Sequence, residues 1–213
     1  MKTYTDIVFD IDGTLLDTER TGVLSLIQTI RELTGREVPY EEAYYFFGIP
    51  SSKAASMLGY ADEERFALVW EEHYQELMHL VTPFPGVEDV LRDLRAAGRR
   101  TGVVTSRSST EIAYDPHLAK LLPYFDVVVG FEQSTRHKPF PDPMLAYLEK
   151  AGAAAASTLY VGDTAHDWHC GHDAGCDFAL ADWRGRGLQG TEPEYRFTEA
   201  AQLRAIPGLG LSL

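Results

Sequence analysis

The chain has 213 residues, of which 45% are hydrophobic and 11% aromatic, enough for the core of one domain or of a domain with a smaller insert. The 19 Lys and Arg residues stand against 32 Asp and Glu, which gives a formal net charge of −13 with neutral histidines. Such a charge repels nucleic acid and anionic lipid, so we expect neither as a partner.

The N-terminal stretch and the cysteines bear on the compartment. MKTYTDIVFD lacks the basic head and apolar run of a signal peptide, and no stretch approaches the roughly 20 apolar residues of a membrane span. Cys170 and Cys176 do not form a Cys-x-x-Cys pair, and their spacing suggests free thiols, with one disulfide left open. We therefore expect a cytoplasmic protein that is a monomer or a weak dimer.

Short apolar runs alternate along the chain with amphipathic stretches. The predicted strands are Ile7–Ile11, Thr101–Thr105, Val127–Gly130, Thr158–Gly162 and Phe178–Ala181, with a weaker one near Tyr195–Phe197. Between them, Val87–Ala97 and Pro143–Ala151 have the apolar spacing of helices. Nearly all of the strands are continuously apolar, as expected when both faces are covered. The pattern predicts an α/β fold with a doubly wound parallel sheet.

One segment interrupts this alternation. From about Thr18 to Val81 the pattern predicts helices alone, at roughly Thr21–Thr34, Glu41–Phe47, Ser52–Leu58 and Asp62–Val81, the last capped by Asp62. Roughly 60 helical residues are too many for one crossover between neighbouring strands. We therefore expect a helical cap domain at 18–82, inserted into a catalytic core made of 1–17 and 83–213.

Polar residues follow the predicted strands at their carboxyl ends, where an open α/β sheet binds its ligand. These residues are Asp10, Asp12, Thr105, Ser106, Lys138, Asp163 and Asp167. Asp10 and Asp12 are one residue apart, and like charges at that range raise each other's pKa unless a cation or a proton lies between them.

This inventory suits a metal and a phosphate. Asp10, Asp12 and Asp163 form a set of hard oxygen ligands of the kind that Mg²⁺ prefers. Lys138, the Thr105 hydroxyl and the N–H groups of a helix start would hold the remaining phosphate charge. That helix start is indicated by Ser108-x-x-Glu111, a capping-box spacing.

Four motifs occur in a fixed order: DIDGT, the hydroxyl residue Thr105, Lys138 in HKPFPDP, and GDTAHD. In this order the chain resembles the haloacid dehalogenase superfamily, in the branch of small phosphatases with a helical cap inserted after the first strand. The resemblance covers essentially the whole chain. A lone Asp-x-Asp is weak evidence, whereas four ordered motifs at strand ends are specific. Phosphoglycolate phosphatases and small pyrophosphatases resemble it more in overall pattern than sugar-phosphate mutases do, and the sequence does not choose between them.

The resemblance implies a role for each motif residue. Asp10 would attack phosphorus and form an aspartyl-phosphate, and Asp12 would serve as general acid and then as general base. Mg²⁺ would be held by Asp10, the Asp12 carbonyl and Asp163, with support from Asp167. The phosphate-binding set would be Gly13, Thr105, Ser106 and Lys138. An acid at Asp12 favours phosphoryl transfer over carbon–halogen cleavage.

The insert carries the candidates for substrate specificity. Its aromatic run, Tyr40 to Phe47, is expected to be mostly the core of the insert itself. In capped relatives the loop at the glycine that follows contacts the leaving group, so the resemblance makes Phe47, Ile49, Ser51 and Lys53 candidates. Similar sugar-phosphate mutases carry basic residues about this glycine and a histidine after the first motif. Phe47, Ser51 and Gly22 stand at those positions, which disfavours mutase activity.

Several alternatives stay open. The stretch HDWHCGHDAGC places His169, His172, Asp173 and Cys176 on one helical face, so a structural zinc within 166–176 competes with simple packing on the sheet. The leading function is a Mg²⁺-dependent phosphatase whose cap closes over a small phosphorylated metabolite; inorganic pyrophosphate is an alternative substrate. A phosphorylation-switch module would be shorter and lack the insert. A non-catalytic phosphate-binding module would not need the complete motif set.

Overall fold

The computed structural model describes residues 2–47, 49 and 51–211. The chain divides into two compact units, which we call the core unit (Met1–Leu16 with Pro83–Leu213) and the helical unit (Asp17–Thr82). Two short strands, β2 (Leu16–Asp17) and β3 (Thr82–Pro83), pair where the chain leaves and re-enters the core unit.

The core unit is built on a six-stranded sheet with the order β5-β4-β1-β6-β7-β8. Its strands are β1 (Asp6–Phe9), β4 (Arg100–Val104), β5 (Val127–Val129), β6 (Thr158–Gly162), β7 (Asp177–Ala181) and β8 (Tyr195–Phe197). Every pairing is parallel. The order reverses at β1, because the chain adds strands first on one side of it and then on the other. The predicted doubly wound α/β fold is therefore confirmed.

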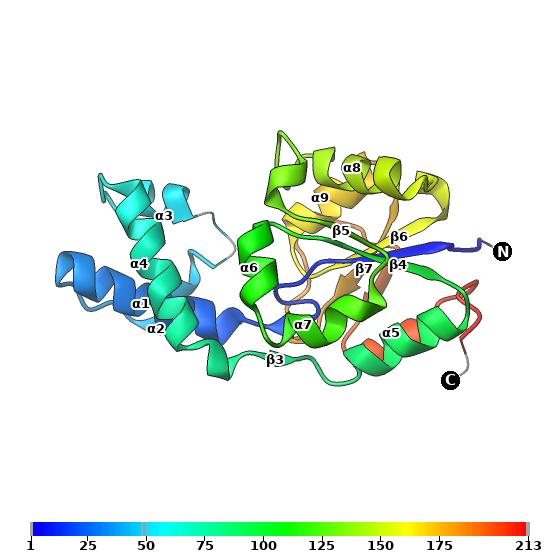
Figure 1. Ribbon diagram of the computed structural model, residues 1–213, viewed down its shortest axis with the longest axis horizontal. Helices are drawn as coiled ribbons and strands as arrows, with labels where there is room; N and C mark the ends of the chain where they lie inside the picture. Colours follow the sequence, from blue (N-terminus) through cyan, green and yellow to red (C-terminus); the bar gives the residue numbers. More distant parts are fainter. Residues whose placement is uncertain (1, 48, 50, 212–213) are drawn as a thin grey trace. The chain divides into compact units, whose positions relative to one another are not determined.

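Helices cover both faces of this sheet. They are α5 (Val87–Ala96), α6 (Ser109–Tyr114), α7 (Leu118–Leu121), α8 (Asp142–Ala151) and α9 (Ala165–Asp173), with 3₁₀ turns at Leu122–Tyr124, Phe131–Gln133, Ala155–Ser157 and Ala200–Ala205. Figure 1 shows α8 and α9 on one face and α5 and α7 on the other. With both faces covered, central strands are buried along their length, as all four β1 residues are.

The face under α8 and α9 holds an apolar cluster around Tyr160 and Phe178, both fully buried. Gly171 of α9 lies so close to the Tyr160 ring that an added Cβ would be 3.0 Å from it. Cys170 and Cys176 are free thiols in the same cluster, and burial raises the pKa of each to about 12. This packing fixes the strand ends that carry the polar motifs.

The helical unit consists of α1 (Glu19–Thr34), α2 (Tyr40–Tyr44), α3 (Ser51–Met57) and α4 (Glu63–Glu76), followed by a 3₁₀ turn at Met78–Leu80. Asp62 caps α4 by accepting a hydrogen bond from the Arg65 backbone N–H at 3.0 Å, as predicted. The Trp70 indole donates to Ser25 Oγ at 2.8 Å and joins α4 to α1. The helix predicted to reach Val81 ends at Glu76 because its last turn tightens into 3₁₀ geometry.

The aromatic run of the helical unit is only partly core. Phe46 is buried with Phe66, whereas Tyr45 is 67% exposed. Tyr40, Tyr44 and Phe47 also pack against this core, so most of the run belongs to it, as expected, whereas Tyr45 points to solvent.

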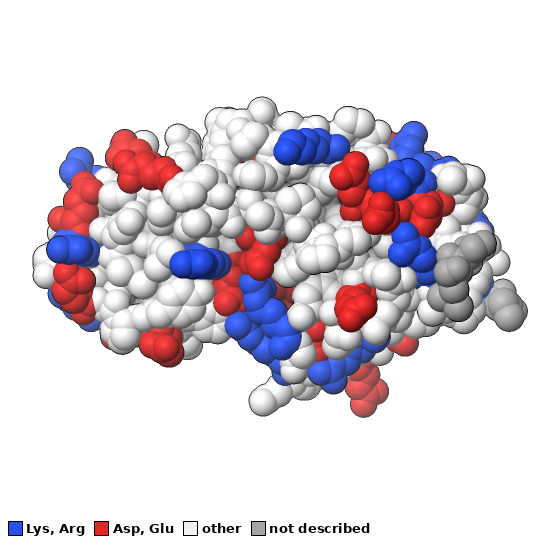
Figure 2. Space-filling model, turned by 90° about the horizontal axis from the view of Figure 1, so that it is seen from below, with Lys and Arg blue, Asp and Glu red and all other residues white. Residues whose placement is uncertain are grey.

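Charge on the surface is mixed. On most of the face drawn in Figure 2, acidic and basic side chains of the described residues are interspersed, and several basic side chains adjoin one another below the middle of the view. Within the described ranges, no helix combines the length and the apolar character that crossing a bilayer requires.

Candidate active site

The first motif forms a tight turn directly after β1. The backbone N–H groups of Leu15 and Leu16 both donate to the carbonyl of Ile11 at 2.9 Å, which turns the chain back on itself. Gly13 has a φ of +82°, and a Cβ built there would overlap the Asp163 carboxylate. Only glycine fits, because both the backbone conformation and the close approach exclude a side chain. Asp10, at 6% exposure, begins this turn.

Lys138 connects the first motif with the fourth. Its Nζ donates to Asp10 Oδ1 at 2.7 Å and to Asp167 Oδ1 at 2.6 Å. The same ammonium lies 5.4 Å from the centre of the Tyr160 ring. Burial alone would lower the pKa of Lys138, but the carboxylates of Asp10 and Asp167 outweigh it and raise that pKa above its ordinary value. Lys138 is therefore a fixed positive charge.

Asp167 lies in the first turn of α9, where a capping box holds it. Its Oδ2 accepts hydrogen bonds from the Thr164 N–H at 3.1 Å and the Thr164 hydroxyl at 2.5 Å. Its Oδ1 accepts from the Tyr160 hydroxyl at 2.9 Å, in addition to Lys138. Burial favours the neutral acid, but Lys138 and these hydrogen bonds prevail and lower the pKa of Asp167. Its two oxygens thus already accept four hydrogen bonds, and it anchors Lys138.

The acids outnumber the positive charge beside them. Asp10, Asp163 and Asp167 each offer an oxygen, and these oxygens lie within 4.8 Å of one another. Burial raises the pKa of Asp10 to about 7; Lys138 opposes this rise, and the charges of Asp167 and Asp12 add to it. Burial and the charges of Asp167 and Asp10 also raise the pKa of Asp163. Three oxygen donors with an excess of negative charge fit a hard divalent cation.

Asp12 has a different environment from Asp10. Its two carboxylate oxygens accept hydrogen bonds from Arg107, at 2.9 Å from Nε and 2.7 Å from Nη2. Arg107 follows β4 and is only 8% exposed, and its Nη1 also donates to Asp115 at 2.6 Å. We did not predict either Arg107 or Asp115 as a site residue. The signal was present, since Arg107 is the one cation within the motif VTSRS and stands two residues after Thr105.

Thr105 and Ser106, both predicted to bind phosphate, differ in exposure. Thr105 is buried, and its hydroxyl accepts a hydrogen bond from the Arg107 N–H at 3.2 Å, so it stabilises the turn after β4. Ser106 is exposed. The predicted capping box of α6 is present, with the Ser108 and Glu111 side chains each bonded to the other's backbone N–H.

The specificity candidates of the insert belong to the helical unit. Phe47 and Ile49 pack against its apolar core, Ser51 is half-buried and Lys53 is exposed. Gly48, the glycine of this loop, lies outside the described residues. A Cβ on Gly22 would be 3.2 Å from the Phe47 ring, so Phe47 occupies the space beside the position where mutases carry a histidine.

Among the described residues, the His and Cys side chains of α9 and of the turn after it do not gather into a metal site. In the described part of the chain, Asp10, Asp163 and Asp167 are the one group of His, Cys, Asp or Glu residues close enough to share an ion. Cys170 and Cys176 point into the apolar cluster, and His172 stacks on Trp168 with ring centres 4.5 Å apart. The packing interpretation of this helix is therefore favoured over a zinc site.

Comparison with known proteins agrees with the motifs. The family described as "Haloacid dehalogenase-like hydrolase" matches residues 7–181, which confirms the family predicted from the sequence. The pyrophosphatase PpaX of Bacillus velezensis is 28% identical over 98% of both chains. A phosphoglycolate phosphatase of Aquifex aeolicus is 31% identical over 92% of this chain and 93% of its own.

Solved structures share the fold. A putative phosphoglycolate phosphatase from Lactobacillus plantarum superposes with a TM-score of 0.85 at 24% identity, covering 94% of this chain and 98% of its own. CbbY from Rhodobacter sphaeroides, solved with phosphate, gives a TM-score of 0.78 at 20% identity, covering 94% and 96%. At these identities the likeness concerns the fold.

Proposed function

The chain belongs to the haloacid dehalogenase-like hydrolase family, and we propose that it is a Mg²⁺-dependent phosphatase that hydrolyses a small phosphate monoester through an aspartyl-phosphate on Asp10. The observation that carries this proposal is the arrangement around Lys138, whose ammonium bridges Asp10 and Asp167 beside Asp163. One cation among three buried or half-buried acids leaves a charge that a divalent metal would neutralise.

The residues at the strand ends divide the reaction into two displacements. In the first, a carboxylate oxygen of Asp10 attacks phosphorus, the ester P–O bond breaks, and Asp12 gives its proton to the departing oxygen. In the second, Asp12 takes a proton from water, whose oxygen attacks the same phosphorus. The bond to Asp10 then breaks, inorganic phosphate leaves and the Asp10 carboxylate is restored.

Two further groups of residues would serve these steps. Lys138, bonded to Asp10, would neutralise charge on the phosphoryl group, and the turn after β4, which Thr105 stabilises, would hold its oxygens. Asp10, Asp163 and the Asp12 carbonyl would hold Mg²⁺, with Asp167 oriented as their support. When bound, Mg²⁺ supplies charge neutralisation for the phosphate oxygens.

Inorganic pyrophosphate is the second candidate substrate. It is favoured by the relatives named pyrophosphatase PpaX, one of which matches 98% of this chain. The same Asp10 chemistry serves, with phosphate as the leaving group. A mutase is disfavoured, because Phe47 fills the space beside Gly22 where mutases carry a histidine.

The test is release of inorganic phosphate from p-nitrophenyl phosphate, phosphoglycolate and pyrophosphate, with Mg²⁺ and with EDTA. We expect Mg²⁺-dependent release from at least one of them by the wild type and none by Asp10→Asn. Release that persists in the variant would overturn the covalent route, and release in EDTA would overturn the metal. Rates on the three substrates decide between a monoester and pyrophosphate.

A further inference from the structure

The reaction described above leaves one buried charge at the site without a role. Arg107 lies in the turn between β4 and α6, and its side chain is 8% exposed. A guanidinium withdrawn from water to this extent loses hydration that its partners must replace. Buried ion pairs are weak evidence for stability, because apolar residues of similar volume often serve the fold as well. Stability alone therefore does not explain the buried Arg107, and its contacts point to the chemistry at the strand ends.

The contact between Arg107 and Asp12 is bidentate. Nε donates to Asp12 Oδ2 at 2.9 Å and Nη2 to Asp12 Oδ1 at 2.7 Å, the forked geometry that fixes the plane of a carboxylate. Asp12 needs such a partner for its orientation, because its side chain is 36% exposed. A carboxylate at that exposure otherwise rotates among several rotamers.

The other side of the guanidinium is anchored to a fixed acid. Nη1 of Arg107 donates to Asp115 Oδ2 at 2.6 Å, and Asp115 is fully buried. The second oxygen of Asp115 accepts from the backbone N–H groups of His117 and Leu118, at 2.8 and 3.0 Å. The start of α7 thus holds Asp115, Asp115 holds Arg107, and Arg107 holds Asp12.

The backbone of Arg107 is fixed as well. Its N–H donates to the Thr105 hydroxyl at 3.2 Å, and its carbonyl accepts from the Phe131 N–H at 2.8 Å. A Cβ on Gly130 would lie 2.8 Å from that carbonyl, so the chain after β5 packs directly on this turn. The backbone of Arg107 and the Asp115 side of its guanidinium are therefore both held by hydrogen bonds.

We propose that Arg107, anchored by Asp115, is a positioning residue that directs the Asp12 carboxyl group toward the leaving group of the substrate. The inference rests on the proposed function, in which Asp12 protonates the departing oxygen. A forked contact suits this task, because each Asp12 oxygen keeps a lone pair outside the fork, and one of these can carry the proton that passes to the leaving group. The bonds made and broken are those of the two displacements already given.

The inference predicts a dependence on the leaving group. A p-nitrophenolate departs without a proton, whereas the alkoxide of an alkyl phosphate such as phosphoglycolate needs one. A misdirected Asp12 therefore slows the alkyl ester far more than the aryl ester. The parameter to compare is kcat/KM, which ends at the departure of the leaving group and excludes hydrolysis of the phosphoenzyme.

The experiment measures kcat/KM of wild type, Arg107→Lys, Arg107→Gln and Asp115→Asn on both esters. Asp115→Asn keeps the oxygen that caps α7 and removes the acceptor of Arg107. For Arg107→Gln and Asp115→Asn, we expect kcat/KM on phosphoglycolate to fall by at least about tenfold more than kcat/KM on the aryl ester. This difference lies within the roughly 10²–10⁴-fold rate effect of acid–base catalysis. Arg107→Lys keeps the positive charge but cannot make the forked contact, so its loss of kcat/KM on phosphoglycolate should be smaller than that of the other two variants.

Arg100→Lys is the matched control. Arg100 also pairs with a buried acid, Asp6, at 2.5 Å, but at the opposite end of β1. Arg100→Lys should change kcat/KM by the same factor on both esters. Thermal melting of every variant separates loss of folding from misplacement of the Asp12 side chain. Equal losses on both esters in Asp115→Asn and Arg107→Gln would show a role in folding or in holding the shared phosphoryl group, and would overturn the inference. An unchanged kcat/KM in both variants would also overturn the inference. A wild type that is inactive on both esters and on pyrophosphate would overturn the proposed function, and this inference with it.

Discussion

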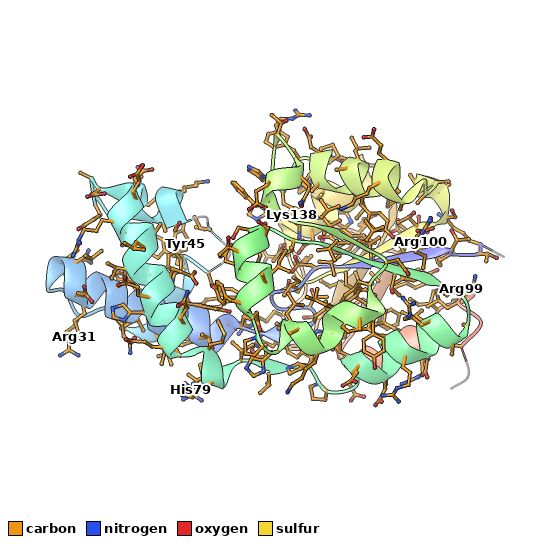
Figure 3. All side chains as sticks on the ribbon, in the orientation of Figure 1. Arg31, Tyr45, His79, Arg99, Arg100 and Lys138 are labelled. Atoms are coloured by element: carbon orange, nitrogen blue, oxygen red, sulfur yellow. The ribbon has the colours of Figure 1, made fainter. Side chains whose placement is uncertain are left out.

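Strand β1 carries a buried aspartate at each end, and the two have opposite surroundings. Asp6 begins the strand and is 1% exposed, whereas Asp10 follows its last residue and is 6% exposed. Figure 3 labels their basic partners, Arg100 beside Asp6 and Lys138 beside Asp10, at opposite ends of the sheet. Burial alone therefore does not distinguish a structural acid from a candidate nucleophile.

The balance of charge distinguishes them. Asp6 accepts hydrogen bonds from Arg100 at 2.5 Å, from the Tyr147 hydroxyl at 3.1 Å and from the Thr5 hydroxyl at 2.8 Å, so one acid meets one cation. Asp10 shares the single ammonium of Lys138 with Asp167, with Asp163 close by. The first network is complete within the protein, whereas the second still favours a further cation.

Replacing each aspartate by asparagine should show the largest difference between the two ends of β1. Asp10→Asn removes the attacking oxygen, so turnover should fall by at least about 10³-fold while the melting temperature stays near that of the wild type. Asp6→Asn weakens the pairing of Arg100 and should cost about 1–3 kcal/mol of folding free energy with turnover largely retained. Phosphate release and thermal melting of both variants give the answer; equal effects on activity would remove the distinction between the two ends.

Metal binding should be confined to the Asp10 end. A ligand that binds only the folded state at 100 times its Kd stabilises by about 2.7 kcal/mol, so Mg²⁺ should raise the melting temperature of the wild type. Asp163→Asn should abolish this rise, because it removes one of the three oxygen donors. Asp173→Asn, an exposed acid on α9, is the control and should keep the rise. A full response in Asp163→Asn would place the ion elsewhere.

Gly→Ala substitutions at two glycines with positive φ distinguish the effect of backbone strain from that of steric overlap. Gly13 and Gly35 have φ values of +82° and +70°, but a Cβ overlaps Asp163 at the first and meets nothing within 4 Å at the second. Each Gly→Ala change should cost about 1 kcal/mol of stability through the backbone alone. Gly13→Ala should in addition lose the Mg²⁺-induced rise in melting temperature and most activity. If both variants kept that rise, the close approach of Gly13 to Asp163 would be of no consequence.

The smallest expected effect concerns two buried tyrosines. Tyr160→Phe removes the hydroxyl that donates to Asp167 and keeps the ring beneath Lys138, so kcat should fall by a few-fold, up to about tenfold. Tyr147→Phe removes a comparable hydroxyl from Asp6 and should leave kcat unchanged. Steady-state kinetics on both proteins, with melting curves beside them, measure this; a decrease of kcat in Tyr147→Phe alone would reverse the assignment.

Much of the core unit could be predicted because its signals are local. Thr158–Gly162 matches the predicted strand in full, since a continuous, mostly apolar run defines a buried strand. Tyr195–Phe197, predicted from a weaker pattern, also matches, although it is only half-buried. The proximity of Asp10, Lys138 and Asp163 also follows from sequence, because the carboxyl ends of parallel strands meet at one edge.

What could not be predicted depends on tertiary pairing. The position of Arg107 after β4 marks it as a candidate site residue, but its partner, Asp12, lies 95 residues away and is fixed only by the fold. Tyr45 and Phe46 are adjacent aromatic residues, and only the packing of α2 decides which of them is buried. The end of α4 depends likewise on how its last turn tightens.

The proposed mechanism requires a covalent phosphoryl group on Asp10, and mass spectrometry can detect this group directly. Asp12→Asn, which slows release of the phosphoryl group, is mixed with p-nitrophenyl phosphate and Mg²⁺ and quenched in acid, and its peptides are analysed by mass spectrometry. We expect the added mass of one phosphoryl group on the peptide that contains Asp10, and none in a variant that also carries Asp10→Asn. A phosphoryl group on another residue, or turnover of the ester without any phosphorylated peptide, would contradict it.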